Sequence, residues 1–166
     1  PSSVKKIGKY CFYECSSLKN VTIPSSVTTL EQGLFLNCKS LETIDGSFNI
    51  INDICFCNCP SLTKINSRSV ITNIGNSAFR HCSSLKSIDI SSVKTIGENA
   101  FYNCSLELFT IPSSVTTITE NSFYGCKSMK SIVIPSSVNK ICCNSFATCK
   151  NLESVEIPSS VTNIEK

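Results

Sequence analysis

Cysteine is the residue of this chain with the most chemical potential: there are twelve, against one histidine and no tryptophan. Thiolates bind zinc when they lie in clusters such as C-x-x-C with a second pair or histidines nearby. Only two groups approach that spacing, Cys11 with Cys15, and Cys55 with Cys57 and Cys59. The pattern is a poor match to a metal site, and we expect neither a metal nor any other cofactor.

Seven of the cysteines recur at intervals of 23, 21, 23, 22, 22 and 23 residues, each three residues after a phenylalanine. They are Cys15, Cys38, Cys59, Cys82, Cys104, Cys126 and Cys149. A free thiol packs as a small hydrophobe, so a cysteine in step with a phenylalanine indicates a core position. We predict mostly reduced, buried thiols here. Disulfides between neighbouring coils are the alternative, which an oxidising location would favour.

Catalytic chemistry finds little support among the remaining residues. His81 lies between Arg80 and Cys82, in a position where most other copies have Glu, Asn or Gly, and we expect it to be an exposed loop residue. No serine lies in a G-x-S-x-G frame or has a second histidine to pair with, so a hydrolase triad is not indicated. The sequence predicts a protein that is not an enzyme.

The elements that position these residues are repeats, of which Pro112–Ile134 is the cleanest copy. The repeats span residues 1–23, 24–44, 45–67, 68–90, 91–111, 112–134 and 135–157, with a partial copy at 158–166. Repetition at this period is typical of a solenoid in which each unit buries its apolar face against its neighbours. We predict a single array of about seven coils of 21–23 residues. Because the first residue already lies inside a repeat, we expect a fragment of a longer protein.

Each repeat predicts one coil. Leu85–Ile90 ends in alternating apolar and polar residues, which is typical of a short strand. A proline and two serines then supply turn chemistry, and the following Val-x-x-Ile predicts a weakly strand-like segment. In Gly97–Cys104 the residues Ala100 and Cys104 stand at i and i+4, which predicts a short helical turn.

The repeat I-P-S-S-V-x-x-I-x-x-x-x-F-x-x-C-x-x-L-x-x-I-x resembles the BspA-like class of leucine-rich repeats, over essentially the whole chain. The resemblance implies an α/β fold: a right-handed solenoid with one parallel β-sheet face and short helical turns on the other side. It also implies surface proteins of mucosal bacteria and protist parasites that adhere to host cells or matrix proteins. The family brings no catalytic motif.

Recognition must come from the variable positions, because the apolar positions form the scaffold. The residues expected to point outward from the strands are polar and of alternating charge, without the Trp, Tyr or Arg typical of a binding hot spot. The candidate protein-contact residues are Lys19, Thr22, Glu42, Lys64, Lys86, Asp89, Glu107, Thr110, Lys130, Val133, Glu153 and Glu156. Tyr10, Tyr13, Tyr102 and Tyr124 flank the repeat phenylalanines and cysteines, and we expect them on the convex side or its edge, partly packed.

Composition limits the partners. The formal net charge is +3 with no basic run, which argues against nucleic acid, and no apolar stretch is long enough to span a membrane. We predict an interaction module for a protein ligand, with possible self-association, at the cell surface or secreted. The alternative is a cytoplasmic scaffold or regulatory repeat protein, in which twelve reduced thiols would be natural.

Overall fold

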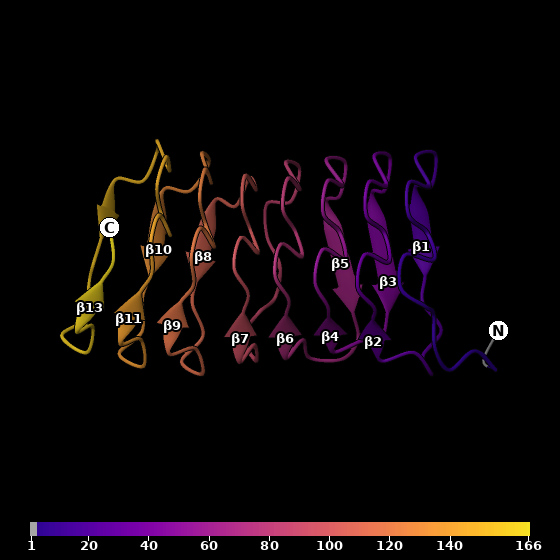
Figure 1. Ribbon diagram of the computed structural model, residues 1–166, viewed down its shortest axis with the longest axis horizontal. Coiled ribbons are helices and arrows are strands. Elements are labelled where there is room, and N and C mark those ends of the chain that lie inside the picture. Colours follow the sequence, from indigo (N-terminus) through magenta and orange to yellow (C-terminus); the bar gives the residue numbers. More distant parts are fainter. Residues whose placement is uncertain (1–2) are drawn as a thin grey trace.

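The protein is a parallel β-solenoid, described here from a computed structural model in which residues 3–166 are placed. The coils stack side by side along one long axis, with the two chain ends at opposite ends of the stack (Figure 1). Seven repeat phenylalanines mark its length, and the six intervals of 21–23 residues between them are six complete turns. The predicted solenoid with a parallel sheet is therefore confirmed.

One series of strands runs toward the lower rim in Figure 1, with one strand in every coil from the first to the seventh except the fourth. Its members are β1 (Asn20–Thr22), β3 (Thr43–Gly46), β5 (Lys64–Ser67), β8 (Leu108–Thr110), β10 (Ser131–Val133) and β12 (Ser154–Val155). They form two parallel sheets, β1-β3-β5 and β8-β10-β12, in which Val21, Ile44 and Ile65 stand in register. The surface made by the outward residues of this series is called the strand face below.

A second series returns from the lower rim. It comprises β2 (Thr29–Leu30), β4 (Ile50–Ile51), β6 (Asn73–Ile74), β7 (Thr95–Ile96), β9 (Thr117–Ile118), β11 (Lys140–Ile141) and β13 (Asn163–Ile164). These strands form the parallel sheets β2-β4-β6-β7 and β9-β11-β13. The prediction of one sheet face was therefore incomplete: the Val-x-x-Ile segments pair as regularly as the first series does.

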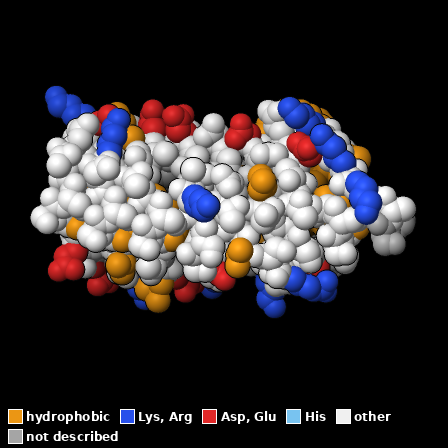
Figure 2. Space-filling view, turned by 90° about the horizontal axis from the view of Figure 1, so that it is seen from below, with side chains coloured by type: hydrophobic (Ala, Val, Ile, Leu, Met, Phe, Trp, Pro, Cys, Tyr) orange, Lys and Arg blue, Asp and Glu red, His pale blue; other side chains and the backbone are white. Residues whose placement is uncertain are grey.

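The Pro-Ser-Ser-Val corners form the lower rim, which we call the corner edge. In the corners that begin at Pro24, Pro112, Pro135 and Pro158 the valine N–H donates to the proline carbonyl, as Val115 does to Pro112 at 3.0 Å. The second serine then joins neighbouring coils, since Ser137 Oγ donates to Val115 O at 2.8 Å. Figure 2 views this edge and shows it largely white, because hydroxyl side chains and backbone cover it and few charges interrupt it.

The Phe-x-x-Cys segments form the opposite rim, the turn edge, and here the predicted helical turns are wrong. No helix forms within residues 3–166, so the described chain contains none that could cross a membrane. Within Ser77–Cys82, alternate N–H groups donate to the next coil and the ones between them to carbonyls three residues back; Phe79 donates to Ala100 O at 2.9 Å, and Cys82 to Phe79 O at 3.0 Å. In an α-helix, all of these N–H groups would instead donate to carbonyls of the same coil.

Left-handed residues make this alternation possible. Asn99 and Asn103 have φ near 55°, and His81 has a φ of 62°. Asparagine adopts this left-handed conformation more readily than most residues do. Because a left-handed residue interrupts a right-handed helix, no helix continues beyond one turn here. The predicted burial of Ala100, Phe101 and Cys104 is nevertheless confirmed, because the turns present the same side chains inward.

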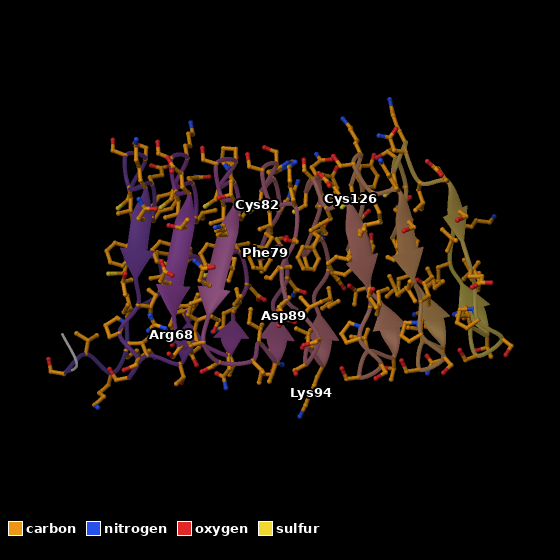
Figure 3. All side chains as sticks on the ribbon, turned by 180° about the vertical axis from the view of Figure 1, so that it is seen from behind. Arg68, Phe79, Cys82, Asp89, Lys94 and Cys126 are labelled. Carbon is orange, nitrogen blue, oxygen red and sulfur yellow. The ribbon has the colours of Figure 1, made fainter. Side chains whose placement is uncertain are left out.

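The core consists of columns that run along the solenoid axis. The phenylalanine rings stack in near-parallel pairs, with Phe101 at 5.5 Å from Phe79 and 5.6 Å from Phe123. The cysteine column lies beside them, toward the turn edge, as Phe79, Cys82 and Cys126 show in Figure 3. Every coil thus repeats the same contact with the next.

The inward assignment is wrong at one end of the stack. Val155 and Ile157 hold core positions in their repeat but are 37% and 52% exposed. The coil that contains them has a full neighbouring coil on one side only. Since burial in a solenoid comes from both neighbours, the same residue types are half-covered there.

Candidate protein-contact surface

The outward positions of the first strand series lie where the alternation placed them. All twelve candidate contact residues are exposed: Lys19, Thr22, Glu42, Lys64, Lys86, Asp89, Glu107, Thr110, Lys130, Val133, Glu153 and Glu156. Side chains along a strand alternate between the two faces of the sheet, so the residues on either side of an inward core residue must point outward. Exposure makes them available to a partner, and their role as contacts remains a prediction.

Negative and positive side chains alternate from coil to coil at the position just before the strands β8, β10 and β12 of this face. Glu107, Lys130 and Glu153 follow one another in adjacent coils, joined by backbone hydrogen bonds of 3.1 and 3.2 Å. Lys86 precedes them, and its Nζ lies 3.0 Å from a carboxylate oxygen of Glu107. Both side chains of that pair are more than half exposed, so solvent screens the attraction and it adds little stability.

The strand face is interrupted in the fourth coil. Leu85–Ile90 was predicted to end in a short strand, and the structure pairs this segment with neither β5 nor β8. Ile90 takes the corner position that proline holds in other coils, since its carbonyl accepts the N–H of Val93 at 2.9 Å. The segment therefore has one residue fewer in which to pair before the chain turns.

A local hydrogen bond adds to this departure. Asp89 Oδ1 accepts the backbone N–H of Ser91 at 3.0 Å, which is an Asx turn. Such side chain to backbone bonds compete with a sheet ladder for the same stretch of chain. The shorter corner and the Asx turn together explain why the sheet divides here.

The division leaves a groove of about 520 Å³ between the fourth and sixth coils. Its apolar lining includes Ile88, Leu108 and Val133, and Asp89 supplies its one charged side chain. Leu108 is 70% exposed and Val133 is 58% exposed, which is unusual for branched apolar residues on a sheet surface. Exposed apolar groups that share a groove are typical of a binding surface.

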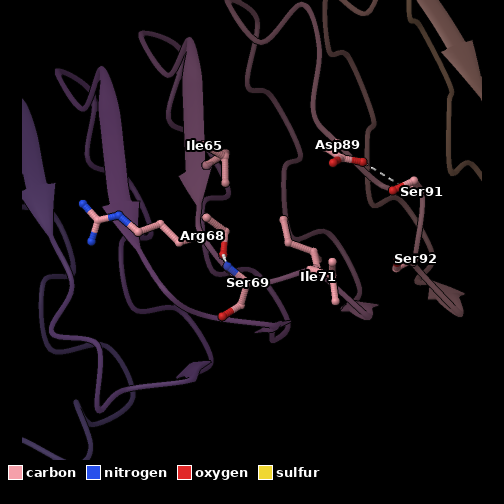
Figure 4. Close-up of a pocket in the computed structure, with 9 residues that line it drawn as sticks. Ile65, Arg68, Ser69, Ile71, Asp89, Ser91 and Ser92 are labelled. Carbon is pink, nitrogen blue, oxygen red and sulfur yellow. Dashed lines mark hydrogen bonds between the residues drawn. The ribbon is translucent and has the colours of Figure 1, made fainter.

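Asp89 also borders a smaller pocket of about 220 Å³ on the side of β5. Arg68 lines that pocket, yet its side chain points away from Asp89 (Figure 4). The hydrogen bonds from Ser91 lower the pKa of Asp89, so its carboxylate is charged at neutral pH. A free negative charge therefore stands between the two hollows.

The turn edge carries a second cluster, where Arg80 lies 4.9 Å from the ring centre of Tyr102. Tyr102 and Tyr124 stack at 4.6 Å, and the His81 ring meets Tyr102 edge-on at 5.5 Å. His81 lies in a turn, as expected for a loop residue, but the expected exposure is wrong: the residue is half-buried, because its ring packs on the neighbouring coil. Burial, followed by the Arg80 charge, lowers the pKa of His81.

The repeat cysteines are free thiols that point into the core, as the spacing predicts. Burial raises the pKa of Cys38 to about 11, and the pKa values of Cys82 and Cys104 lie further above the usual range. Thiols held protonated are poor metal ligands and poor nucleophiles. Among residues 3–166 no group of three or more His, Cys, Asp or Glu side chains is arranged to hold a metal ion.

Comparison with known protein families decides what this array is. The model of the BspA-type leucine-rich repeat region matches residues 1–51 and 49–166, with six copies. The chain belongs to this family. The predicted resemblance is therefore confirmed over its whole length.

Solved leucine-rich-repeat proteins share the fold of this BspA-type array. A leucine-rich repeat protein from Bacteroides ovatus is 32% identical, with a TM-score of 0.86 over 96% of this chain and 42% of that one. A leucine-rich cell surface protein from Faecalibacterium prausnitzii is 33% identical, with a TM-score of 0.61 over 89% of this chain and 35% of that one. The array thus spans less than half the length of both proteins.

A third solved protein is less similar in sequence and shares the leucine-rich repeat and the fold. The leucine-rich repeat protein of T. pallidum is 26% identical, with a TM-score of 0.64 over 99% of this chain and 71% of that one. No curated protein matches this chain. The comparisons therefore identify a leucine-rich repeat protein with a cell-surface relative, and they assign it no ligand.

The structure gathers five of the candidate contact residues of this BspA-type array into one region. Lys86, Asp89, Glu107, Thr110 and Val133 lie in or beside the groove, whereas the other seven are spread along the remaining coils. Leu108 was missed. Its signal was present, since Phe109 and Ile111 point inward and the residues alternating with them must point outward.

Proposed function

We propose that this leucine-rich-repeat array is a non-catalytic module that binds a protein ligand at the cell surface, through the groove on its strand face. The observation that carries the proposal is the exposure of Leu108 and Val133 beside the charged Asp89. Apolar anchors with a charge at their rim are the usual composition of a protein-binding site. The cell-surface relative from F. prausnitzii supports the location.

Adhesion to host cells or matrix proteins is the finer form of this proposal. A fluorescently labelled array, applied to wells coated with individual purified matrix proteins, tests it against a Leu108→Ser, Val133→Ser double variant. The expected result is saturable binding that the double variant lowers at least about tenfold, because two apolar anchors worth about 1–2 kcal/mol each are removed.

Ile164→Thr is the matched control. Ile164 is 57% exposed and belongs to the second strand series, outside the groove. We expect this variant to bind as the parent does. Equal losses in both variants, or wells that retain the array no better than albumin-coated wells, would contradict the proposed site.

A cytoplasmic scaffold is the second candidate, and the thiol column favours it. The buried cysteines serve as hydrogen-bond donors, which a disulfide sulfur cannot do. A count of free thiols on protein purified from its native source without reductant separates the two functions. Twelve free thiols favour the cytoplasm, and fewer favour an oxidising location.

A further inference from the structure

The turn edge is a second surface with a composition unlike the strand face. Its outward positions are the residue after each repeat phenylalanine and the residues on either side of each repeat cysteine, because the residue before each phenylalanine is buried in most coils. Four of them are cations, Lys39, Arg80, Lys127 and Lys150, and Glu14 is the one acid. None of these four cations forms an ion pair with a carboxylate in the described part of the chain.

These cations are spaced along the solenoid axis. Lys39 belongs to the second coil, Arg80 to the fourth, Lys127 to the sixth and Lys150 to the seventh. Neighbouring coils are about 4.8 Å apart, so the first three cations recur roughly every 10 Å. A row of this kind matches an extended ligand with charges at regular intervals better than a compact ion.

A groove of about 530 Å³ lies on this edge, and Lys127 is the one of the four cations that lines it. Its lining includes Asn58, His81, Ser83, Asn103 and Lys127, and it has few apolar side chains. A neighbouring hollow of about 370 Å³ shares Asn58 with this groove and is lined by Lys39 together with the acid Glu14. Amide and hydroxyl groups in such a groove both donate and accept hydrogen bonds.

Gly125 lines this groove beside Asn103. Its φ of 68° matches the left-handed residues at the same place in other coils, and a Cβ there would lie 2.0 Å from Asn103 Oδ1. The amide of Asn103 lies against His81, with 3.4 Å between Nδ2 and the ring Nδ1. The missing side chain makes room for the Asn103 amide, whose oxygen occupies the space that a Cβ would take.

We propose that the turn edge binds an anionic polysaccharide, with its sulfate or carboxylate groups on the cations and its hydroxyls on the asparagines and serines. A protein partner fits less well, because the groove lacks the apolar anchors that the strand face has. Single-stranded nucleic acid also fits less well. It requires open aromatic faces for its bases, and Tyr102 is covered by Arg80 and Tyr124.

The test measures binding of a fluorescein-labelled heparin octasaccharide by anisotropy at fixed ionic strength. Lys39→Gln, Lys127→Gln and Lys150→Gln are combined in one variant, which leaves Arg80 and its packing intact. The matched control combines Lys19→Gln, Lys64→Gln and Lys94→Gln, three exposed lysines away from this edge. Both variants lose the same net charge.

The turn-edge variant should bind on the order of tenfold more weakly, since three charge-assisted contacts are lost, and the control variant should match the parent. A chondroitin sulfate octasaccharide and a hyaluronan octasaccharide distinguish sulfate from carboxylate as the recognised group. Equal weakening in both variants would overturn the proposal. So would parent protein that binds none of the three saccharides, or binds polyglutamate or oligothymidylate as tightly as the best of them.

Discussion

The thiol of Cys82 donates a hydrogen bond to the carbonyl oxygen of Phe56 in the preceding coil, at 3.1 Å. The same arrangement joins Cys59 to Phe35 and Cys104 to Phe79. The carbonyls of Phe35 and Phe79 also accept the N–H of the cysteine in their own turn, so both of their lone pairs are used. Cysteine therefore fills a small core site and satisfies a buried acceptor at once.

Replacing a repeat cysteine should cost stability through that hydrogen bond. Cys82→Ala leaves the Phe56 carbonyl with one bond fewer and creates a small void, and we expect a loss of about 1–3 kcal/mol in the free energy of unfolding. Denaturant unfolding with reductant present measures it. Cys11→Ala, at an exposed cysteine, should change stability by less than about 0.5 kcal/mol. Similar values for the two variants would mean that the repeat thiol has no structural role.

Truncating a central phenylalanine should be more costly. Phe101 is fully buried, stacks between Phe79 and Phe123, and meets Phe109 edge-on at 5.3 Å. We expect Phe101→Ala to lower the free energy of unfolding by about 3–5 kcal/mol. Chemical denaturation of Tyr13→Ala, at a ring that is 46% exposed, provides the comparison. A loss below about 1 kcal/mol at Phe101 would refute its core position.

Alkaline pH should unfold the array. In the unfolded chain a thiol ionises near its ordinary pKa of 9.0, whereas folding raises the pKa of Cys38 to about 11 and those of Cys82 and Cys104 further. Between these values the unfolded state binds fewer protons than the folded state, so stability falls as pH rises above about 9. Each such thiol contributes up to about 1.4 kcal/mol per pH unit.

Unfolding curves between pH 7.5 and 10.5 with reductant measure this dependence. Cys82→Ala should make the slope shallower by the contribution of one thiol. A free energy of unfolding that stays constant to pH 10.5 would show that the repeat thiols are not held protonated by the fold.

Two glycines provide a matched test of the turn geometry. Gly125→Ala forces a Cβ against Asn103 at a φ of 68°, and we expect a loss of about 1–3 kcal/mol. Gly8→Ala meets no atom within 4 Å at an ordinary φ and should be neutral or slightly stabilising. Thermal melting of both variants would decide the matter, and equal melting temperatures would argue against the left-handed turn at Gly125.

The candidate site was predictable in part. The outward parity of Asp89, Thr110 and Val133 follows from the inward residues that alternate with them. Their meeting around a groove did not follow, because it depends on the segment Lys86–Ile90 being unpaired between β5 and β8. The cluster of Arg80, His81 and Tyr102 likewise joins residues from adjacent coils, which only stacking brings into contact.

The sequence by itself determined the repeat, the inward residues and the parallel stacking, because the pattern of apolar side chains is written in each copy and recurs seven times. The tertiary structure decided where the backbone hydrogen bonds go. Half of the N–H groups in a turn such as Ser77–Cys82 find their acceptors in the next coil, and this turned an expected helix into paired turns. It likewise divided the sheet at Lys86–Ile90, since pairing depends on how neighbouring coils meet and not on one coil alone.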